Sequence, residues 1–201
     1  QVEPRSFLEP HRPDMKSTFE IIKSNYERDK KQNTPCIIGI NGIDCAGKTS
    51  LAKDLSGRLK QSGIKNEICH IDDFNDPKVE KETYQAFASG NWNENDFDRY
   101  YESIIDFQKA RAAVEAATVK NEIVIVEGIF IFRPQLKITF NYRIYLEVDA
   151  SVALTRFEQR RRLQGDVRPV EIFTDIWVRA HNKYVSEMHP QKISNLVIQG
   201  K

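Results

Sequence analysis

One eight-residue stretch constrains this chain more than any other part of its sequence. Residues 42–49 read Gly-Ile-Asp-Cys-Ala-Gly-Lys-Thr and match the phosphate-binding loop pattern G-x-x-x-x-G-K-[ST] without deviation. The apolar run Cys36–Ile40 precedes the match and a helical pattern follows it, which is the strand–loop–helix context that this loop requires. Glycines let backbone N–H groups curl around phosphate oxygens, and the helix N-terminus adds a positive dipole.

The loop predicts a site for a nucleoside triphosphate and its Mg²⁺ ion. Lys48 would reach the β- and γ-phosphates, and the Thr49 hydroxyl would be a Mg²⁺ ligand. The residues expected to contact the nucleotide are Gly42, Ile43, Asp44, Cys45, Ala46, Gly47, Lys48, Thr49 and Ser50. A GTPase is not indicated, because the only Asn-Lys pair, Asn182-Lys183, lacks the Asp of the base-reading pattern N-K-x-D.

Apolar runs and amphipathic stretches alternate along the chain. We expect strands at residues 36–40, 68–71, 122–127, 142–148 and 196–198. Helical patterns cover residues 14–31, 49–61, 77–89, 96–118, 151–163 and 170–188. Strands that alternate with helices predict an α/β fold with a parallel sheet. We expect an N-terminal arm and helix in residues 1–35 and a P-loop kinase domain in residues 36–201.

Composition excludes several classes of protein. Among 201 residues, 30 Lys and Arg balance 29 Asp and Glu, and the net charge of +1 argues against a nucleic-acid partner. No apolar run approaches the ~20 residues of a membrane span, and we expect neither a membrane partner nor a signal peptide. The three cysteines, Cys36, Cys45 and Cys69, form no CxxC pair, so we expect them to be reduced in a cytoplasmic protein.

Acidic side chains follow two of the expected strands. The segment His70-Ile-Asp72-Asp73-Phe74 ends one strand, and Glu127 ends another. In an open α/β sheet, ligands gather at the carboxyl ends of strands. Phosphoryl transfer to a hydroxyl needs a carboxylate near the attacking oxygen, a role for Asp72 or Asp73, and Glu127 fits a Walker B residue that acts on Mg²⁺. The alternative is a solvated turn with an Asp helix cap.

Basic residues gather on the expected helix 151–163. Arg156 and Arg160 lie four residues apart and therefore share a face of this helix. Mobile arginines neutralise the charge that phosphoryl transfer spreads over the γ-phosphate oxygens, so both are candidates for a lid over the nucleotide. A solvated helix face is the alternative.

Taken together, these segments resemble the uridine kinase / phosphoribulokinase family of P-loop kinases. The resemblance covers residues 36–199, and the segments that carry it are Gly42–Thr49, His70–Phe74, Asp96–Tyr100, Val126–Ile129, Leu146–Asp149 and Pro190–Ile198. It implies the P-loop NTPase fold, with a doubly wound five-stranded parallel sheet of order 2-3-1-4-5 and a helical lid. It also implies transfer of the ATP γ-phosphate to a hydroxyl of a small molecule, such as a nucleoside, ribosyl or sugar-like compound.

The resemblance assigns roles to individual residues. Those implied for catalysis are Lys48, Asp72, Glu127, Arg156 and Arg160, with Asp72 accepting the proton of the acceptor hydroxyl. Those implied for Mg²⁺ are Thr49, Asp72 and Glu127. Candidates for contact with the acceptor are Asp72, Phe74, Trp92, Asn93 and Arg133. Trp92 would stack on an acceptor ring or anchor a loop, and Arg133 would line the acceptor pocket or pack in the core.

The sequence departs from uridine kinases around the acceptor. Asn93 stands nearest to the position where they place an Asp, and Asn75 replaces the aromatic residue that follows their D-x-F segment. Their base-reading His and Tyr hairpin has no counterpart, because residues 110–122 run straight from helix to strand. The identity of the acceptor, and ATP against GTP as the donor, stay open.

Two other functions stay open. A nucleotide-binding regulator would use the ATP state as a switch without acceptor turnover. A nucleoside monophosphate kinase would need an arginine for the acceptor phosphate near residues 75–100, where Arg99 is the only one. The expected helix 14–31 would either cap the sheet or make a contact in a homo-oligomer.

Overall fold

The computed structural model describes residues 15–29 and 35–200. At its centre lies one five-stranded parallel sheet of order β2-β3-β1-β4-β5, which confirms the predicted order. The strands are β1 Cys36–Gly42, β2 Asn66–His70, β3 Ile123–Gly128, β4 Tyr142–Glu147 and β5 Leu196–Gln199. All six residues of β3 are buried, as expected for a strand of a parallel sheet that is covered on both faces.

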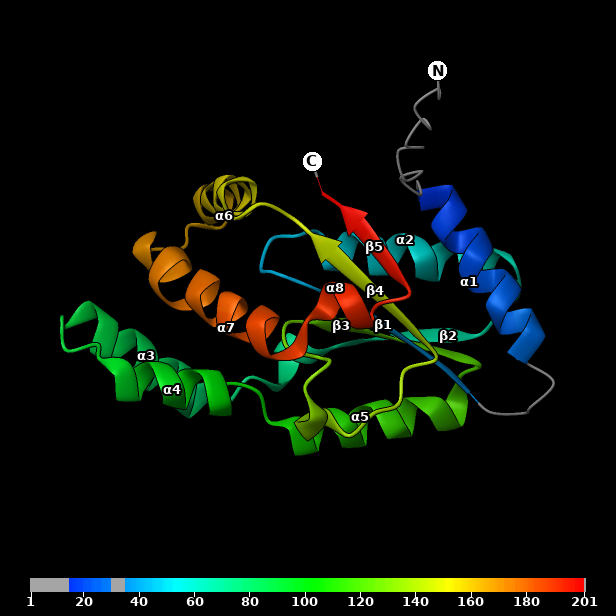
Figure 1. Cartoon of the computed structure of the whole chain (residues 1–201), viewed down its shortest axis with the longest axis horizontal. Coiled ribbons are helices and arrows are strands. Elements are labelled where there is room, and N and C mark those ends of the chain that lie inside the picture. Colours follow the sequence, from blue (N-terminus) through cyan, green and yellow to red (C-terminus); the bar gives the residue numbers. More distant parts are fainter. Residues whose placement is uncertain (1–14, 30–34, 201) are drawn as a thin grey trace, which may run out of the picture.

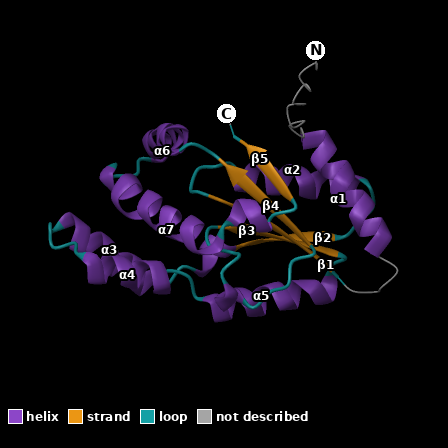
Figure 2. Ribbon diagram, viewed as in Figure 1, coloured by secondary structure: helices purple, strands orange, loops and turns teal. Residues whose placement is uncertain are grey.

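Helices cover both faces of the sheet. Figure 2 shows the strands as one layer between helices. Helix α2 (Lys48–Gln61) packs on β1, β2 and β3, and α5 (Phe107–Lys120) lies on the opposite face against β2 and β3 (Figure 1). The short helix α8 (Pro190–Ile193) contacts β4. Among the described residues, no helix combines the length and apolar character needed to cross a bilayer.

The N-terminal helix α1 (Met15–Asp29) packs against α2. Its buried stripe consists of Phe19, Ile22 and Tyr26, which recur at helical spacing. The Tyr26 hydroxyl also donates a hydrogen bond to Glu122 Oε1 at 2.6 Å. Residues 14, 30 and 31 of the predicted helix lie outside the described residues.

The single helix predicted at 96–118 is wrong, because two helices occupy this region. Helix α4 (Glu94–Ser103) ends before Ile104, and α5 begins after Asp106, whose side chain caps it by accepting from Lys109 N–H. The intervening residues pair with the segment after β2: Asp76 N–H donates to Ile104 C=O at 2.7 Å, and Asp106 N–H donates to Phe74 C=O at 2.9 Å. Competition from this tertiary pairing breaks the helix.

Helix α4 forms a pair with α3 (Pro77–Ala88), and both project beyond the sheet (Figure 1). Three side-chain contacts at successive turns join α4 to α7 (Arg179–Met188). They are Glu94 with Arg179, Asp98 with Lys183, and Tyr101 with Glu187.

The segment between β4 and β5, in which the lid was predicted, combines helices of two kinds. Helix α6 (Ala150–Gln164) begins at the Asp149 cap and ends at Gly165, which has the left-handed backbone typical of a helix C-terminus. The chain then passes through π-helical turns at Phe173–Val178 before α7 begins. The prediction of helix over 170–188 did not foresee these wider turns, which occur frequently at functional sites.

Candidate functional site

The loop between β1 and α2 has the conformation that anion binding requires. Gly47 lies in the left-handed region with φ of 100°, and Cys45 also has a positive φ of 61°. A side chain at Gly42 would place its Cβ 2.7 Å from Leu146 C=O, so the start of the loop needs a glycine for close packing on β4. The helix N-terminus behind the loop directs its free N–H groups toward a bound anion.

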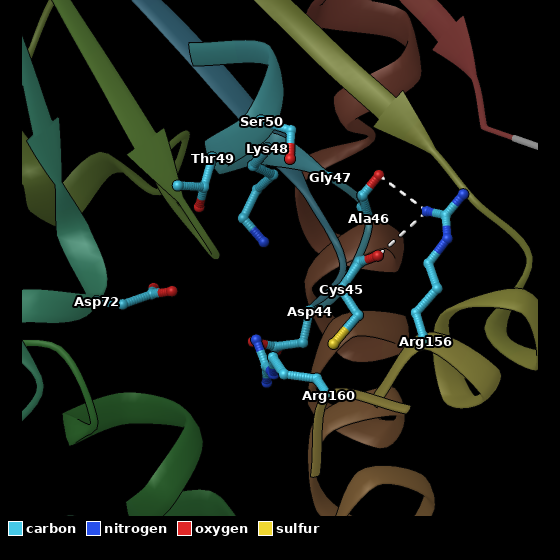
Figure 3. A pocket seen from close by; sticks show the side chains of 10 residues that line it. All are labelled: Asp44, Cys45, Ala46, Gly47, Lys48, Thr49, Ser50, Asp72, Arg156 and Arg160. Carbon is cyan, nitrogen blue, oxygen red and sulfur yellow. Dashed lines mark hydrogen bonds between the residues drawn. The ribbon is translucent and has the colours of Figure 1, made fainter. Parts of the chain in front are cut away.

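A cavity of about 490 Å³ opens in front of this loop (Figure 3). We call it the P-loop cavity, and its lining residues are Asp44, Cys45, Ala46, Gly47, Lys48, Thr49, Ser50, Asp72, Arg156 and Arg160. Its volume lies within the ~300–1,000 Å³ range of small-molecule sites. Of the residues predicted to contact the nucleotide, Gly42 and Ile43 do not line this cavity.

The Lys48 side chain is held by a hydrogen bond with its amine directed into the P-loop cavity. Its side chain is buried, with 5% of its surface exposed. The Nζ group donates a hydrogen bond to Ile43 C=O at 2.9 Å. Figure 3 shows the amine pointing into the cavity, on the side that faces Asp72. The lysine charge therefore lies where phosphate oxygens would enter.

Glu127 at the end of β3 joins the P-loop to β2. Its Oε1 accepts from the Thr49 hydroxyl at 2.9 Å and from His70 Nδ1 at 2.5 Å. Its Oε2 is buried and has no hydrogen-bond partner among the described residues. A buried carboxylate oxygen without a partner is costly, and a cation would satisfy it. Sequence reasoning did not foresee the role of His70, which orients the carboxylate.

The donor set fits Mg²⁺ shared with phosphate groups. Within residues 15–29 and 35–200, no three His, Cys, Asp or Glu side chains are arranged to hold a metal by themselves. Mg²⁺ prefers oxygen ligands and usually binds through one or two protein groups plus substrate phosphates and water. Thr49 and Glu127 supply such groups beside the phosphate loop.

Asp72 lies across the P-loop cavity from Lys48, in a short 3₁₀ turn (Ile71–Phe74) that follows β2. Its carboxylate reaches the solvent of the cavity but is surrounded by protein, and this desolvation raises its pKa to about 6. Lys48 lowers the pKa, whereas the nearby carboxylates Asp44 and Glu127 raise it further. A carboxylate with a pKa near neutrality is suited to take up a proton.

The two predicted lid arginines have different contacts. The Arg156 guanidinium donates to the carbonyl oxygens of Cys45 and Ala46, both at 3.2 Å (Figure 3). It therefore clamps the back of the P-loop and holds these carbonyls away from the anion side. Arg160, one turn further along α6, is exposed and lines the P-loop cavity, as expected of a mobile charge above a nucleotide.

A smaller cavity of about 150 Å³ adjoins the first and shares Asp44, Asp72 and Arg160 with it. We call it the second cavity, and its other lining residues are Asn75, Glu80, Tyr84, Tyr100, Ile104, Ile129, Arg168 and Trp177. The Asp72 carboxylate thus stands between a phosphate-binding loop and a separate polar space. The sequence reasoning predicted none of these additional residues as an acceptor contact, and it noted Asn75 only as a replacement for an aromatic residue.

The predicted acceptor residues other than Asp72 line neither cavity. Asn93 accepts from Asn95 N–H and Asp96 N–H, and so serves as the N-cap of α4. Trp92 packs edge-on against a phenylalanine of α3, with 6.2 Å between ring centroids. Phe74 is partly buried and packs against the hydrophobic core.

Arg133 occupies the core-packing position that the sequence left as an alternative. The guanidinium is buried, donates to Tyr101 C=O at 2.8 Å and forms an ion pair with Glu102 at 2.5 Å. It lines a different cavity, beside the connection from β3 to β4.

Comparison with curated proteins gives one relative, and it is described as a deaminase subunit rather than a kinase. No family model matches the chain. The tRNA-specific adenosine deaminase subunit tad2 of Schizosaccharomyces pombe is 24% identical over 165 residues, which cover 78% of this chain and 41% of that protein. The chain thus spans about two fifths of the length of this curated relative.

Two solved structures share the fold. A candidate fructose transport system kinase from Silicibacter sp. TM1040 aligns with a TM-score of 0.66 and 14% identity, over 92% of this chain and 98% of that chain. A possible uridine kinase from Bacillus stearothermophilus aligns with a TM-score of 0.56 and 18% identity, over 89% of this chain and 99% of that chain. At these identities the likeness shows the P-loop NTPase fold alone, and the chemistry must be argued from the site.

Proposed function

We propose that this protein is an ATP- and Mg²⁺-dependent kinase that phosphorylates a hydroxyl group of a small molecule. The observation that carries the proposal is the position of Asp72, which faces Lys48 across the P-loop cavity and also lines the second cavity. A kinase needs one carboxylate at the junction of a phosphate site and an acceptor site. The two solved structures compared above are described as a possible uridine kinase and a candidate fructose transport system kinase, which agrees with the proposal.

The residues then have separate tasks in the transfer. The P-loop N–H groups and Lys48 bind the phosphates, while Arg160 approaches the transferred group. The acceptor oxygen forms a bond to the γ-phosphorus as the bond to the β–γ bridging oxygen breaks, and that oxygen keeps the electron pair on ADP. The hydroxyl proton passes to Asp72 and then to solvent. Bound Mg²⁺, held by Thr49 and Glu127, would neutralise charge on the β- and γ-phosphates.

Three other functions have less support. A regulatory switch would not need Asp72 beside a second cavity. A nucleoside monophosphate kinase needs an arginine for the acceptor phosphate, but Arg99 is paired with Glu82 and Arg168 with Asp166. Arg160, which also lines the second cavity, is assigned above to the transferred phosphoryl group. A zinc deaminase needs the patterns H-x-E and P-C-x-x-C, and the sequence contains neither.

The test is ADP release with Mg-ATP across a panel of nucleosides, ribosyl pyridines, pantothenate, sugars and sugar phosphates. We expect one class to stimulate release, and both Lys48→Ala and Asp72→Asn to abolish the stimulated rate. Nucleotide binding should survive Asp72→Asn but not Lys48→Ala. ATP binding without stimulation by any acceptor would contradict the kinase and favour the switch.

A further inference from the structure

The size of the second cavity restricts the acceptor. Its volume of about 150 Å³ is less than a third of the 490 Å³ of the P-loop cavity. Sites for drug-sized ligands measure ~300–1,000 Å³. The second cavity therefore matches a compound of monosaccharide size or smaller more closely than a ribose that carries a base.

The aromatic rings that could stack on a base are already in use. Arg168 lies over the ring of Tyr84, 5.4 Å from its centroid, and over the ring of Trp177, at 5.2 Å. Each contact occupies the face of the ring that Arg168 covers. The only other aromatic residue that lines the second cavity, Tyr100, is 96% buried, with 4% of its surface exposed.

Arg168 is fixed in this position. Its Nε group is 3.0 Å from each carboxylate oxygen of Asp166, and its NH1 group donates to the Tyr84 hydroxyl at 2.9 Å. Arg161 on α6 also donates to the backbone carbonyl of Arg168. A guanidinium held by a forked carboxylate contact keeps a fixed geometry, so Arg168 forms a rigid wall of the second cavity.

The polar groups of the second cavity suit several neutral hydroxyls. Asp44, Asp72 and Glu80 provide carboxylate oxygens, and Asn75 Oδ1 is buried without a hydrogen-bond partner among the described residues. Such acceptors bind the hydroxyl protons of a polyol. The charge of Arg168 is balanced by Asp166, so the three carboxylates face one remaining arginine of this cavity, Arg160. The carboxylates outnumber it, and this excess of negative charge disfavours a phosphorylated acceptor.

From these observations, and resting on the kinase function above, we infer that the acceptor is a neutral polyhydroxy compound of monosaccharide size or smaller. Arg168, fixed over Tyr84 and Trp177, is the residue that excludes nucleosides from the second cavity.

The experiment measures binding and turnover separately. Calorimetry in the presence of Mg²⁺ and a non-hydrolysable ATP analogue would compare neutral monosaccharides and alditols with uridine, cytidine and sugar phosphates. ADP release would be measured with the same compounds. We expect at least one neutral polyol to bind about tenfold more tightly than any nucleoside or sugar phosphate.

Variants test the exclusion by Arg168. Arg168→Ala should shift the ratio of uridine affinity to polyol affinity by about tenfold toward uridine, because it frees both ring faces. Arg168→Gln, which retains more of the side-chain volume, guards against a folding failure of the alanine variant. The control Arg162→Ala changes an exposed arginine of α6 and should leave the ratio unchanged. If Arg168 had only a structural role, its replacement would weaken the binding of all acceptors equally and leave the ratio of uridine affinity to polyol affinity constant.

Failure of this inference is distinguishable from failure of the kinase function. Turnover with a nucleoside or sugar phosphate and no polyol binding would overturn the inference while supporting the kinase. Polyol binding without ADP release for any compound would overturn the kinase, while supporting a neutral polyol as the ligand of the second cavity. Absence of binding by every polyol, with the ATP analogue bound, overturns the inference in either case.

Discussion

The hydroxyl of Thr49 donates to Oε1 of Glu127 across 2.9 Å, which connects the first turn of α2 to the end of β3. These residues lie 78 positions apart in the sequence and meet because β1 and β3 are neighbours in the sheet. The contact positions two Mg²⁺ ligand candidates before any ligand enters. Preorganised groups of this kind lose less freedom on binding.

Removal of either member of this pair should impair the response to Mg²⁺. Thr49→Val removes the hydroxyl, and Glu127→Gln removes the charge that a cation needs. We expect each change to lower ADP release by roughly a hundredfold and to raise the Mg²⁺ concentration at half-maximal rate by about tenfold. Thr155→Val, on the exposed side of α6, is the matched control. An unchanged Mg²⁺ titration in both site variants would remove this pair from the metal site.

Asp72→Asn should lower the rate of phosphoryl transfer without lowering the stability of the folded chain. The loss of a general base costs roughly 10²–10⁴-fold in rate, and nucleotide binding should remain. The Asp72 side chain is exposed to the cavity, but desolvation by the surrounding protein raises the pKa of its carboxyl to about 6, above its ordinary value of 3.8. The ionised carboxylate is therefore mildly unfavourable in the folded chain at neutral pH. The variant should therefore have a higher Tm than the unliganded parent at pH 7 and a smaller difference at pH 4. Asp73→Asn, at the neighbouring position that lines neither cavity, is the control; a Tm gain of equal size there would argue against the desolvation explanation.

Arg156→Ala should weaken nucleotide binding without removing any group that faces the phosphates. The guanidinium holds the carbonyls of Cys45 and Ala46 at the back of the P-loop, and its loss lets the loop relax. We expect about a tenfold rise in the Kd of an ATP analogue, measured by fluorescence titration. Arg162→Ala should bind the analogue as the parent does. Equal affinities of the parent, Arg156→Ala and Arg162→Ala for the analogue would show that nucleotide binding does not need the contact of Arg156 with the P-loop.

His181 should make stability depend on pH. Burial, together with the smaller effect of the positive charge of Lys48, lowers the pKa of this imidazole to about 4. In the unfolded chain the imidazole binds its proton near pH 6.5. The free energy of unfolding is therefore unaffected by His181 above that pH, and it decreases as the pH falls from 6.5 to 4, by about 3 kcal/mol.

His181→Phe tests this dependence, because the ring can still stack on Tyr145. Thermal unfolding between pH 7 and pH 4 should show a flatter profile for this variant than for the parent. His189→Asn, at an exposed position with a left-handed backbone, should keep the parent profile. Parallel profiles for parent and His181→Phe would contradict the assignment.

The sheet and the phosphate loop were predictable because both are encoded locally. Short apolar runs mark buried parallel strands, and the spacing of Gly42, Gly47 and Lys48 has few structural uses. The break at residues 104–106 was not predictable from periodicity, since Tyr100, Ile104 and Phe107 keep helical spacing across it. Asp106, which caps α5, was the available signal.

The acceptor side could not be predicted from the sequence for a different reason. Asn93 has the chemistry of a ligand contact, but its side chain satisfies the start of α4. Arg133 was a candidate because it carries a positive charge shortly after β3, yet its guanidinium is buried and forms an ion pair with Glu102. Conversely, Tyr84 and Arg168 lie 84 residues apart and meet only in the folded chain. Which polar side chains remain available depends on tertiary pairing.

The site is assembled from the ends of β1, β2 and β3 together with α6, so no short fragment of the chain contains it. Unfolding of any one of these elements would destroy the nucleotide site. A ligand bound there consequently stabilises the whole domain, by RT ln(1 + [L]/Kd), rather than one loop. Binding of the proposed nucleotide would in this way raise the resistance of residues 35–200 to proteolysis.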